Sequence, residues 1–241
     1  MGLLFIGPLI SPTRFGGSPD LFAAAPPDVR YEYRRIHDPD GIGKFYMGRE
    51  IAWVMSHFGA EWLERPERIK EERTDKLLKA LDIKPGMTVV DLGAGSGYYT
   101  FPMAELIGPK GKVIAVDIQK EMLTIIERRM KTKGVKNVEM VLGTISDPKL
   151  KPDTVDLILM VDVYHEFSHP YEMTQKMVES LKRGGRLVFV EFRREDPNVP
   201  IKLVHKMTQK QVIKEMEPHP LKHARTIGVL PWQHIIIFEK K

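Results

Sequence analysis

VVDLGAGSGY, at residues 89–98, sets the architecture that the rest of this sequence follows. An apolar run from Met87 to Leu92 leads directly into three glycines, and a helical pattern continues to about Ile107. Glycine lets the backbone turn sharply and exposes its atoms to a close ligand, because no side chain covers them. The segment therefore predicts a strand, a ligand-binding loop and a helix in direct succession.

A second acidic residue, Asp117, ends the next apolar run, Lys112–Asp117, about twenty residues after the glycines. In doubly wound sheets a carboxylate at this place accepts hydrogen bonds from both hydroxyls of a ribose. The two features together predict a nucleoside-containing ligand across the carboxyl ends of the first two strands.

The remainder of the chain alternates between apolar runs and amphipathic helical patterns. Further strands are expected at Val138–Leu142, Val155–Val161, Arg186–Phe192 and His234–Phe238, and helices at Glu121–Lys133, Tyr171–Lys182 and Thr208–Glu217. Such alternation is typical of a sheet covered on both faces. We expect an α/β fold over residues 83–241, with a Rossmann-like, doubly wound, mostly parallel sheet and a C-terminal strand pair that includes an antiparallel strand.

Two segments precede this domain. Residues 1–30 are rich in Pro, Gly, Ala and Ser, which predicts a flexible N-terminal arm. Residues 31–82 are expected to form a helical cover, because a charged helical pattern runs from Pro66 to Leu81. Before it, apolar residues recur with helical spacing at Ile51, Val54, Met55 and Phe58.

The composition excludes several classes of protein. The 241 residues include no cysteine, which removes disulfides, thiolate zinc sites and thiol nucleophiles. Lys and Arg number 37 against 32 Asp and Glu, and this mild, interleaved balance argues against nucleic acid as a partner. No run of ~18 apolar residues predicts a transmembrane helix. The sequence does not specify the number of subunits.

We expect a cytoplasmic protein, with export through a weak N-terminal signal as the alternative. Leu3–Ile10 has the character of an apolar signal segment, and Ala23–Ala25 would suit a cleavage site. A charged segment before the apolar run is missing, and Pro8 and Pro12 interrupt it, which argues against cleavage.

The glycine spacing separates two classes of nucleoside ligand. A dinucleotide motif has its third glycine three positions after the second, where this chain has the bulky Tyr98. Asp91 would also place a negative charge beside a pyrophosphate. Both features favour a ligand with a cationic amino-acid end, and a nucleotide-dependent oxidoreductase is kept as an alternative function.

The D-x-G-x-G-x-G arrangement resembles motif I of the class I S-adenosylmethionine-dependent methyltransferases. LKRGGRL at residues 181–187 is similar to the L-K-P-G-G turn before the fifth strand of these enzymes, and DLILM at 156–160 resembles their fourth strand. The resemblance covers about residues 70–192. It implies S-adenosyl-L-methionine as cofactor and methyl transfer to the oxygen, nitrogen or sulfur atom of a small-molecule acceptor. A non-catalytic module that only holds the cofactor is a further alternative.

The resemblance also implies which residues contact the cofactor, with Asp117 in the place of the family's ribose-binding acid. After the third strand the family often has an acid in a G-D-A-like turn near the adenine, whereas this chain has Gly-Thr-Ile at 143–145. Thr144 and the Ile145 backbone are expected there, with Asp147 as the alternative. The full expected set is Asp91, Gly93, Ala94, Gly95, Gly97, Asp117, Ile118, Thr144, Ile145 and Asp162.

HEFSH at residues 165–169 fits the H-E-x-x-H pattern of zinc proteases, whose two histidines share one helix face. Here the segment leaves a buried strand, and Pro170 biases His169 away from helical backbone. The helix is therefore expected to start at Pro170, beyond the motif. We predict no metal site, with a zinc hydrolase using His165 and His169 as the alternative.

His165 is instead the candidate catalytic residue. VYHEF at 163–167 resembles the V-L-H-D-W segment of small-molecule O-methyltransferases, whose histidine is the general base, and an imidazole can accept a hydroxyl proton near neutral pH. Glu166 or Asp162 is expected to orient the ring; the alternative is a histidine that only bonds a backbone carbonyl.

Weaker expectations concern residues outside these motifs. Tyr46 or Arg49 could touch the methionine end of the cofactor, and the acceptor pocket could be lined from segments 191–196, 205–207 and 232–234.

Overall fold

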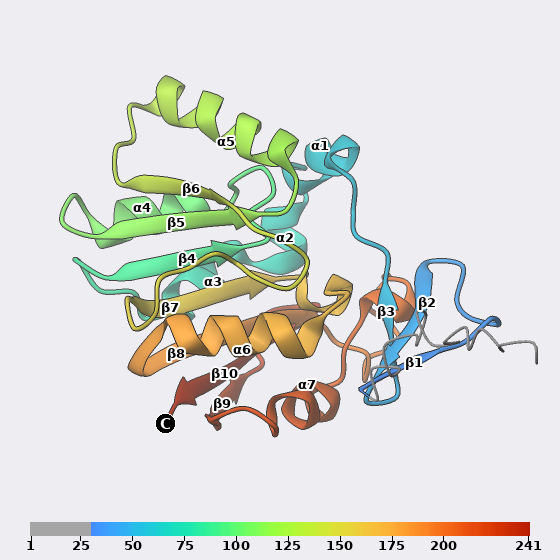
Figure 1. The fold of residues 1–241 in the computed structure, drawn as a ribbon. Helices are drawn as coiled ribbons and strands as arrows, with labels where there is room; N and C mark the ends of the chain where they lie inside the picture. The colour runs from blue at the N-terminus through green and yellow to red at the C-terminus, as the bar shows by residue number, and fades with distance from the viewer. Residues whose placement is uncertain (1–29) are drawn as a thin grey trace, which may run out of the picture.

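The computed structural model describes residues 30–241, so the predicted arm and signal-like segment lie outside the described residues, apart from Arg30. Its main feature is a seven-stranded sheet with the order β6-β5-β4-β7-β8-β10-β9 (Figure 1). The strands are β4 (Thr88–Leu92), β5 (Lys112–Asp117), β6 (Val138–Leu142), β7 (Val155–Val161), β8 (Leu181–Phe192), β9 (Leu221–Ile227) and β10 (Gln233–Lys240). Neighbours from β6 to β8 pair in parallel, and β10 is antiparallel to both β8 and β9. The predicted doubly wound sheet with an antiparallel C-terminal strand is confirmed.

Helices cover both faces of this sheet, as its apolar strands require. One face packs against α3 (Thr74–Ala80), α4 (Thr100–Ile107) and α5 (Lys120–Lys133), and the other against α6 (Pro170–Ser180) and α7 (Gln209–Met216). Successive strand residues alternate between the two cores: Val89 belongs to the first and Val90 to the second. In the order of the sheet the connections reverse between β4 and β7, and such switch points are where open α/β sheets bind ligands.

The segment before the sheet is not the helix that the spacing of Ile51, Val54, Met55 and Phe58 predicts. It forms a small antiparallel sheet of β1 (Tyr31–Tyr33), β2 (Gly41–Tyr46) and β3 (Arg49–Ala52). The cause is a two-residue turn, in which Met47 and Gly48 both have positive φ, as hairpin turns of the favoured hand require. The helical spacing of these apolar residues does not correspond to one buried side of a helix, because Val54 and Phe58 are exposed.

The predicted helix from Pro66 to Leu81 is divided into α2 (Arg68–Glu72) and α3 by Arg73, whose left-handed backbone (φ 49°) no helix can continue. A short α1 (Ala60–Leu63) and the 3₁₀ turn η1 (His57–Gly59) precede α2. The last residue of α1, Leu63, lies against the glycine loop after β4. The cover over that loop is therefore built from short helical pieces.

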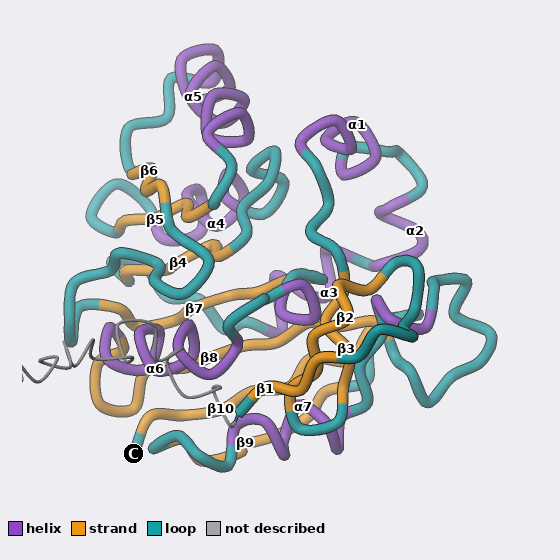
Figure 2. The backbone as a smooth tube through the Cα atoms, turned by 45° about the vertical axis from the view of Figure 1, so that its right-hand side comes forward, coloured by secondary structure: helices purple, strands orange, loops and turns teal. Residues whose placement is uncertain are grey.

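The small sheet lies beyond the carboxyl ends of the parallel strands, toward which the arrowheads of β4, β5 and β7 point in Figure 1. Figure 2 shows β1–β3 close to α7 and apart from α5. Two 3₁₀ turns, η2 (Tyr164–Glu166) and η3 (Leu203–His205), contact β3 at this edge. None of the helices within residues 30–241 is both long and apolar enough to cross a bilayer.

Candidate active site

The loop after β4 has no room for side chains at its glycines. Gly93 has a φ of 74°, and a Cβ atom there would lie 2.4 Å from Cγ2 of Val163. At Gly95, with a φ of 54°, a Cβ atom would lie 2.7 Å from Cδ1 of Leu63. The loop therefore brings its backbone close to the segment after β7 and to the end of α1.

Asp117 is held at the rim of this loop. One of its carboxylate oxygens accepts a hydrogen bond from the Gly95 N–H and the other from the Gln119 N–H, both at 2.9 Å. Burial raises the pKa of Asp117, and these backbone donors act in the opposite direction. Each oxygen retains a lone pair, so the carboxylate can still accept from a pair of hydroxyls.

A pocket, here called the loop pocket, opens between the glycine loop and the segments after β5, β6 and β7. Its lining includes six of the residues expected to bind the cofactor: Gly93, Gly95, Asp117, Ile118, Thr144 and Ile145. Leu92, Met122 and Phe167 supply apolar walls, while Asp147 is bound by Lys149 and takes no part. A largely apolar pocket with the carboxylate of Asp117 beside the glycine loop fits the base and the ribose of an adenosyl group.

Four of the expected cofactor contacts do not line this pocket, and three of them, Asp91, Ala94 and Gly97, lie in or next to the glycine loop. Asp91 is buried and accepts a hydrogen bond of 2.6 Å from the hydroxyl of Thr100 at the start of α4. Ala94 donates its N–H to the carbonyl of Val116, and a Cβ atom on Gly97 would meet Phe101. These three residues support the conformation of the glycine loop and do not face the pocket.

Asp162, the fourth, carries an unmatched buried oxygen. Its Oδ2 accepts from Gln233 at 2.7 Å, but within residues 30–241 its buried Oδ1 has no hydrogen-bond partner. The buried hydroxyl of Tyr99 lacks one as well. Burial raises the pKa of Asp162 well above its ordinary value, and the positive charge of Arg68 opposes this rise. Buried polar atoms are normally hydrogen-bonded, so the unmatched oxygens of Asp162 and Tyr99 are candidates to contact a polar group of a ligand.

His165 is almost completely buried in η2, and its ring is held by Glu191 of β8. The Nδ1 atom lies 2.7 Å from Oε2 of Glu191, whose other oxygen accepts from the Tyr164 N–H. The expectation that Glu166 or Asp162 orients the ring is therefore wrong. Burial favours the neutral ring, but the carboxylates of Glu191 and Glu166 outweigh this effect and raise the pKa of His165.

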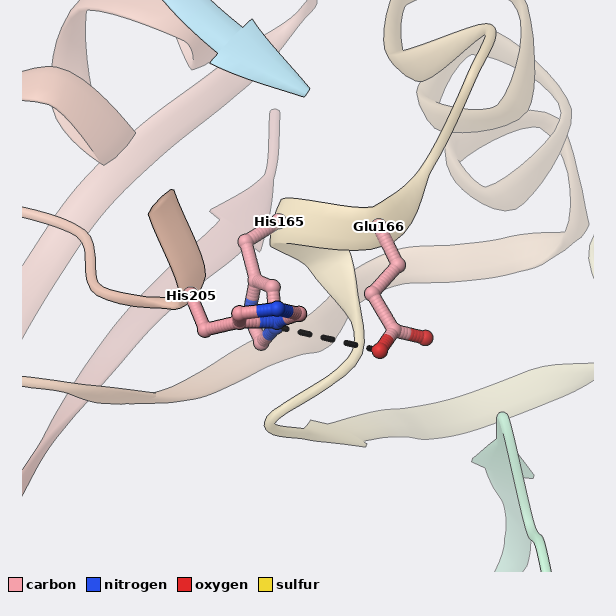
Figure 3. A group of neighbouring side chains, drawn as sticks. All are labelled: His165, Glu166 and His205. Atoms are coloured by element: carbon pink, nitrogen blue, oxygen red, sulfur yellow. Dashed lines mark hydrogen bonds and ion pairs between the residues drawn. The ribbon is translucent and has the colours of Figure 1, made fainter. Parts of the chain in front are cut away.

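The other ring nitrogen of His165 faces a second histidine. Nε2 lies 3.2 Å from Nδ1 of His205 in η3 and 4.0 Å from Oε1 of Glu166 (Figure 3). Burial raises the pKa of Glu166 to about 7 and lowers that of His205 to about 4. Glu166 also lines the loop pocket, so these three residues, the histidine cluster, adjoin it. The pairing of His165 with His205 has no local sequence signal, because 40 residues separate them.

His169 does not join this cluster. The turn η2 ends at Glu166, Phe167 is extended, and α6 begins at Pro170, as predicted. The His169 ring lies 3.0 Å from the Ser168 hydroxyl and packs edge-on against Tyr31. The helix that a zinc-protease motif requires is therefore not formed.

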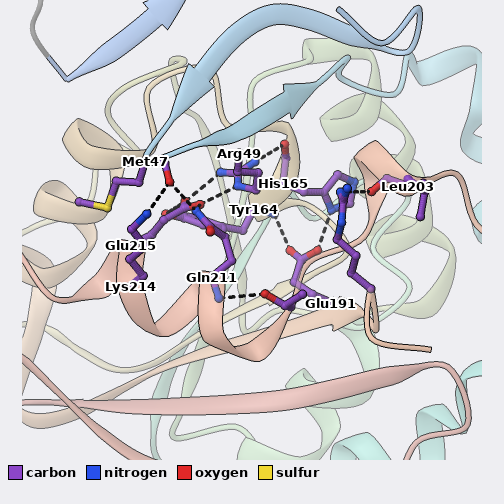
Figure 4. Close-up of polar contacts among 11 residues, drawn as sticks. Met47, Arg49, Tyr164, His165, Glu191, Leu203, Gln211, Lys214 and Glu215 are labelled. Carbon is purple, nitrogen blue, oxygen red and sulfur yellow. Dashed lines mark hydrogen bonds and ion pairs between the residues drawn. The ribbon is translucent and has the colours of Figure 1, made fainter. Parts of the chain in front are cut away.

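A buried polar network supports η2 from the side of the small sheet (Figure 4). Arg49 of β3 forms two hydrogen bonds with Glu215 of α7, at 2.7 and 2.9 Å, and donates a third to the backbone carbonyl of His165. The Tyr164 hydroxyl donates to the same glutamate. Arg49 and Tyr46 were expected near the cofactor; instead Arg49 braces the histidine segment, and Tyr46 packs against Tyr31.

Comparison with known proteins gives a consistent result. A family model described as a methyltransferase domain matches residues 83–235. The solved structure of a SAM-dependent methyltransferase from Aquifex aeolicus superposes with a TM-score of 0.73 and 26% sequence identity, over 78% of this chain and 100% of that one.

Curated relatives match over a shorter region. A demethylmenaquinone methyltransferase from Lactococcus lactis is 29% identical over 126 residues, which are 52% of this chain and 49% of that protein. A protein-L-isoaspartate O-methyltransferase from Pyrococcus horikoshii is 33% identical over 112 residues, 46% of this chain and 47% of that protein. The chain thus spans about half the length of the curated relatives it matches.

Proposed function

Because the chain belongs to the S-adenosylmethionine-dependent class I methyltransferases, we propose that it transfers a methyl group from this cofactor to a small-molecule nucleophile. The cofactor supplies a methyl group activated by a sulfonium. The observation that carries the proposal is the loop pocket, in which the glycine loop, Asp117 and Glu166 line one continuous space. Glu166 would therefore share one space with a ligand that the glycine loop and Asp117 hold.

Each part of the pocket has a distinct task in this proposal. Asp117 accepts from the ribose hydroxyls, and Thr144 and Ile145 lie against the adenine. Asp162 is not itself a lining residue but stands in the chain between two that are, Val161 and Val163, and its unmatched oxygen is assigned to the ammonium group. The chain aligns the acceptor and excludes water, which accounts for much of the rate of such displacements.

A small acceptor is favoured over a polypeptide by the burial of the histidine cluster. His165 and Glu166 are both buried, and the two turns that carry these residues and His205 contact β3. A compact molecule fits such an enclosed end of a pocket better than an extended chain does. The two relatives above are named for different acceptors, demethylmenaquinone and protein L-isoaspartate, so the proposal names a small-molecule nucleophile of oxygen, nitrogen or sulfur without choosing among these atoms.

The proposal is tested first by calorimetry of S-adenosylmethionine and S-adenosylhomocysteine binding. We expect Asp117→Asn to weaken both roughly 10- to 100-fold, because hydrogen bonds to a charged group are lost. Asp147→Asn is the matched control, since this acid lies in the loop after β6 but pairs with Lys149. If the unaltered chain binds neither compound at millimolar concentration, the proposal fails.

We further propose that His165 accepts the proton of the acceptor. Glu191 bonds Nδ1 and so places the ring's lone pair on Nε2, the nitrogen that faces His205 and Glu166, which is how a carboxylate prepares an imidazole base. In a screen of small hydroxyl, amine and thiol compounds, His165→Gln should lower turnover by roughly 10²–10⁴ and leave cofactor affinity unchanged. Equal turnover in the variant would reject His165 as the general base but would leave the proposed methyl transfer standing.

A further inference from the structure

We propose that His165, Glu166 and His205 form a binding site for one divalent first-row transition metal ion, next to the loop pocket. The three potential ligand atoms, Nε2 of His165, Oε1 of Glu166 and Nδ1 of His205, lie within 4.8 Å of one another. Figure 3 shows their side chains converging from η2 and η3. Two imidazoles and one carboxylate are a donor set that zinc and iron(II) sites use in other proteins.

The spacing of the nitrogens matches that of ligands around a single ion. With metal–nitrogen bonds of about 2.0–2.1 Å, two nitrogens on one tetrahedral ion lie about 3.3 Å apart. The two ring nitrogens are separated by 3.2 Å. Oε1 of Glu166 is 4.0 Å from Nε2 of His165, so the carboxylate must approach by less than ~1 Å to complete the set. This oxygen now accepts from the Met55 N–H at 3.1 Å, a bond that it would exchange for the ion.

Glu191 gives the site the support that metal-bound histidines normally have. A ligating histidine almost always donates its other ring N–H to a carboxylate or carbonyl, which fixes the tautomer and makes the bound nitrogen more basic. Nδ1 of His165 has such a partner in Glu191, which is fully buried and also bound to the Tyr164 N–H.

The charges around the cluster also favour a cation. Glu166 and Glu191 bring two buried carboxylates to the histidines. Two positive side chains act on the histidines, and both are paired with carboxylates: Arg49 with Glu215, and Lys202 with Asp40. Arg49 reaches only the backbone carbonyl of His165. Without an ion, the facing nitrogens of His165 and His205 need a proton between them, and this arrangement is the competing outcome.

The role of the ion rests on the proposed function, although its binding does not. Three protein ligands leave a coordination position open, and Glu166 places it beside the loop pocket. A hydroxyl of the acceptor that binds there loses its proton more readily, because a cation lowers the pKa of a bound hydroxyl. The proton passes to water, the oxygen forms its new bond to the methyl carbon, and the bond from that carbon to sulfur breaks. His165 then acts as a ligand, and the ion replaces it in promoting proton loss.

The test is a titration of the full chain with Co²⁺ and Zn²⁺ after treatment with a chelator and its removal. We expect one ion per chain, a visible ligand-field spectrum with Co²⁺, and a higher melting temperature with Zn²⁺. His205→Ala should weaken binding at least 100-fold and abolish the thermal shift, and Glu191→Gln should weaken it 10- to 100-fold. His205 is only half-buried, and Glu166→Gln on the pocket wall is a second ligand variant should His205→Ala fail to fold.

His169→Gln is the matched control, because it changes the other histidine of the H-E-x-x-H pattern and should bind the ion as tightly as the unaltered chain. Absence of stoichiometric binding, or equal binding by the ligand variants, overturns the site. Loss of binding in His169→Gln also overturns it, in favour of a different ligand set. Calorimetry with S-adenosylmethionine on the same metal-free samples separates the two proposals, since cofactor binding without ion binding rejects only the metal site.

Discussion

Asp91 is a buried carboxylate whose partner is the hydroxyl of Thr100, and its burial makes the stability of the chain depend on pH. Burial raises its pKa to about 6, whereas an aspartate in an unfolded chain titrates near 4. Between these values the folded state binds a proton that the unfolded state has released, so the free energy of unfolding falls as the pH rises.

The size of this effect is about 2–3 kcal/mol, since one pKa unit corresponds to about 1.4 kcal/mol. Asp91→Asn keeps a neutral group in the same place and should remove this contribution. In urea denaturation at a series of pH values, the stability of the unaltered chain relative to the variant should fall between about pH 4 and pH 7. Parallel curves for the two proteins would contradict the assignment.

Single functional residues could be predicted from the sequence where a local structure requires one residue type at a fixed position. The glycines and Asp117 could be recognised because a loop that closes on a nucleoside needs them at fixed spacing. Glu191 could not be singled out, since Glu191 and Glu195 stand close together in one charged run and only the register of β8 beside η2 selects the first. The partnership of His165 and His205 depends on tertiary packing and leaves no local pattern.

The hairpin of β2 and β3 owes its shape to Met47 and Gly48, both in left-handed backbone. A Cβ atom on Gly48 would meet nothing within 4 Å, so Gly48→Ala tests the backbone conformation alone. We expect a loss of about 1 kcal/mol in the free energy of unfolding, because an L-residue is disfavoured in this region.

Gly228→Ala is the control for this change. A Cβ atom there also meets nothing within 4 Å, but the backbone has no positive φ. Chemical denaturation should show little change for this variant. Equal losses in both would mean that the turn is not strained by a side chain.

The strands and helices from β4 to α6 were predictable because each is amphipathic or apolar over its whole length. The hairpin was not, because its apolar residues happened to repeat with helical spacing while the turn residues determined the conformation. The break at Arg73 was also missed, since arginine carries no preference for the left-handed region that it adopts.

The small sheet is joined to α7, a helix of the larger domain, by the buried contact of Arg49 with Glu215. Glu215 also accepts from the Tyr164 hydroxyl and from Gln211, so its removal leaves several buried donors without a partner. Glu215→Ala should therefore lower the free energy of unfolding by about 3–5 kcal/mol. The double variant with Arg49→Met should lose less than the sum of the two single changes, as a double-mutant cycle by denaturation would show.

The exposed pair Glu127 and Lys131 on α5 provides the control. Glu127→Ala removes an ion pair of similar length and should change stability by less than about 0.5 kcal/mol. A comparable loss of stability in Glu127→Ala and Glu215→Ala would show that the buried Arg49–Glu215 pair contributes no more to stability than an exposed pair.

The antiparallel strand β10 lies between β8 and β9, although it is the last of the seven to be synthesised. During synthesis on a ribosome, one edge of β8 therefore stays unpaired until β10 has been made and inserts beside it. That edge belongs to an apolar strand carrying Val188 and Val190, of the kind that pairs with foreign strands when left uncovered. Premature termination before Gln233 would thus yield nascent chains prone to aggregate, even with the glycine loop and Asp117 already translated.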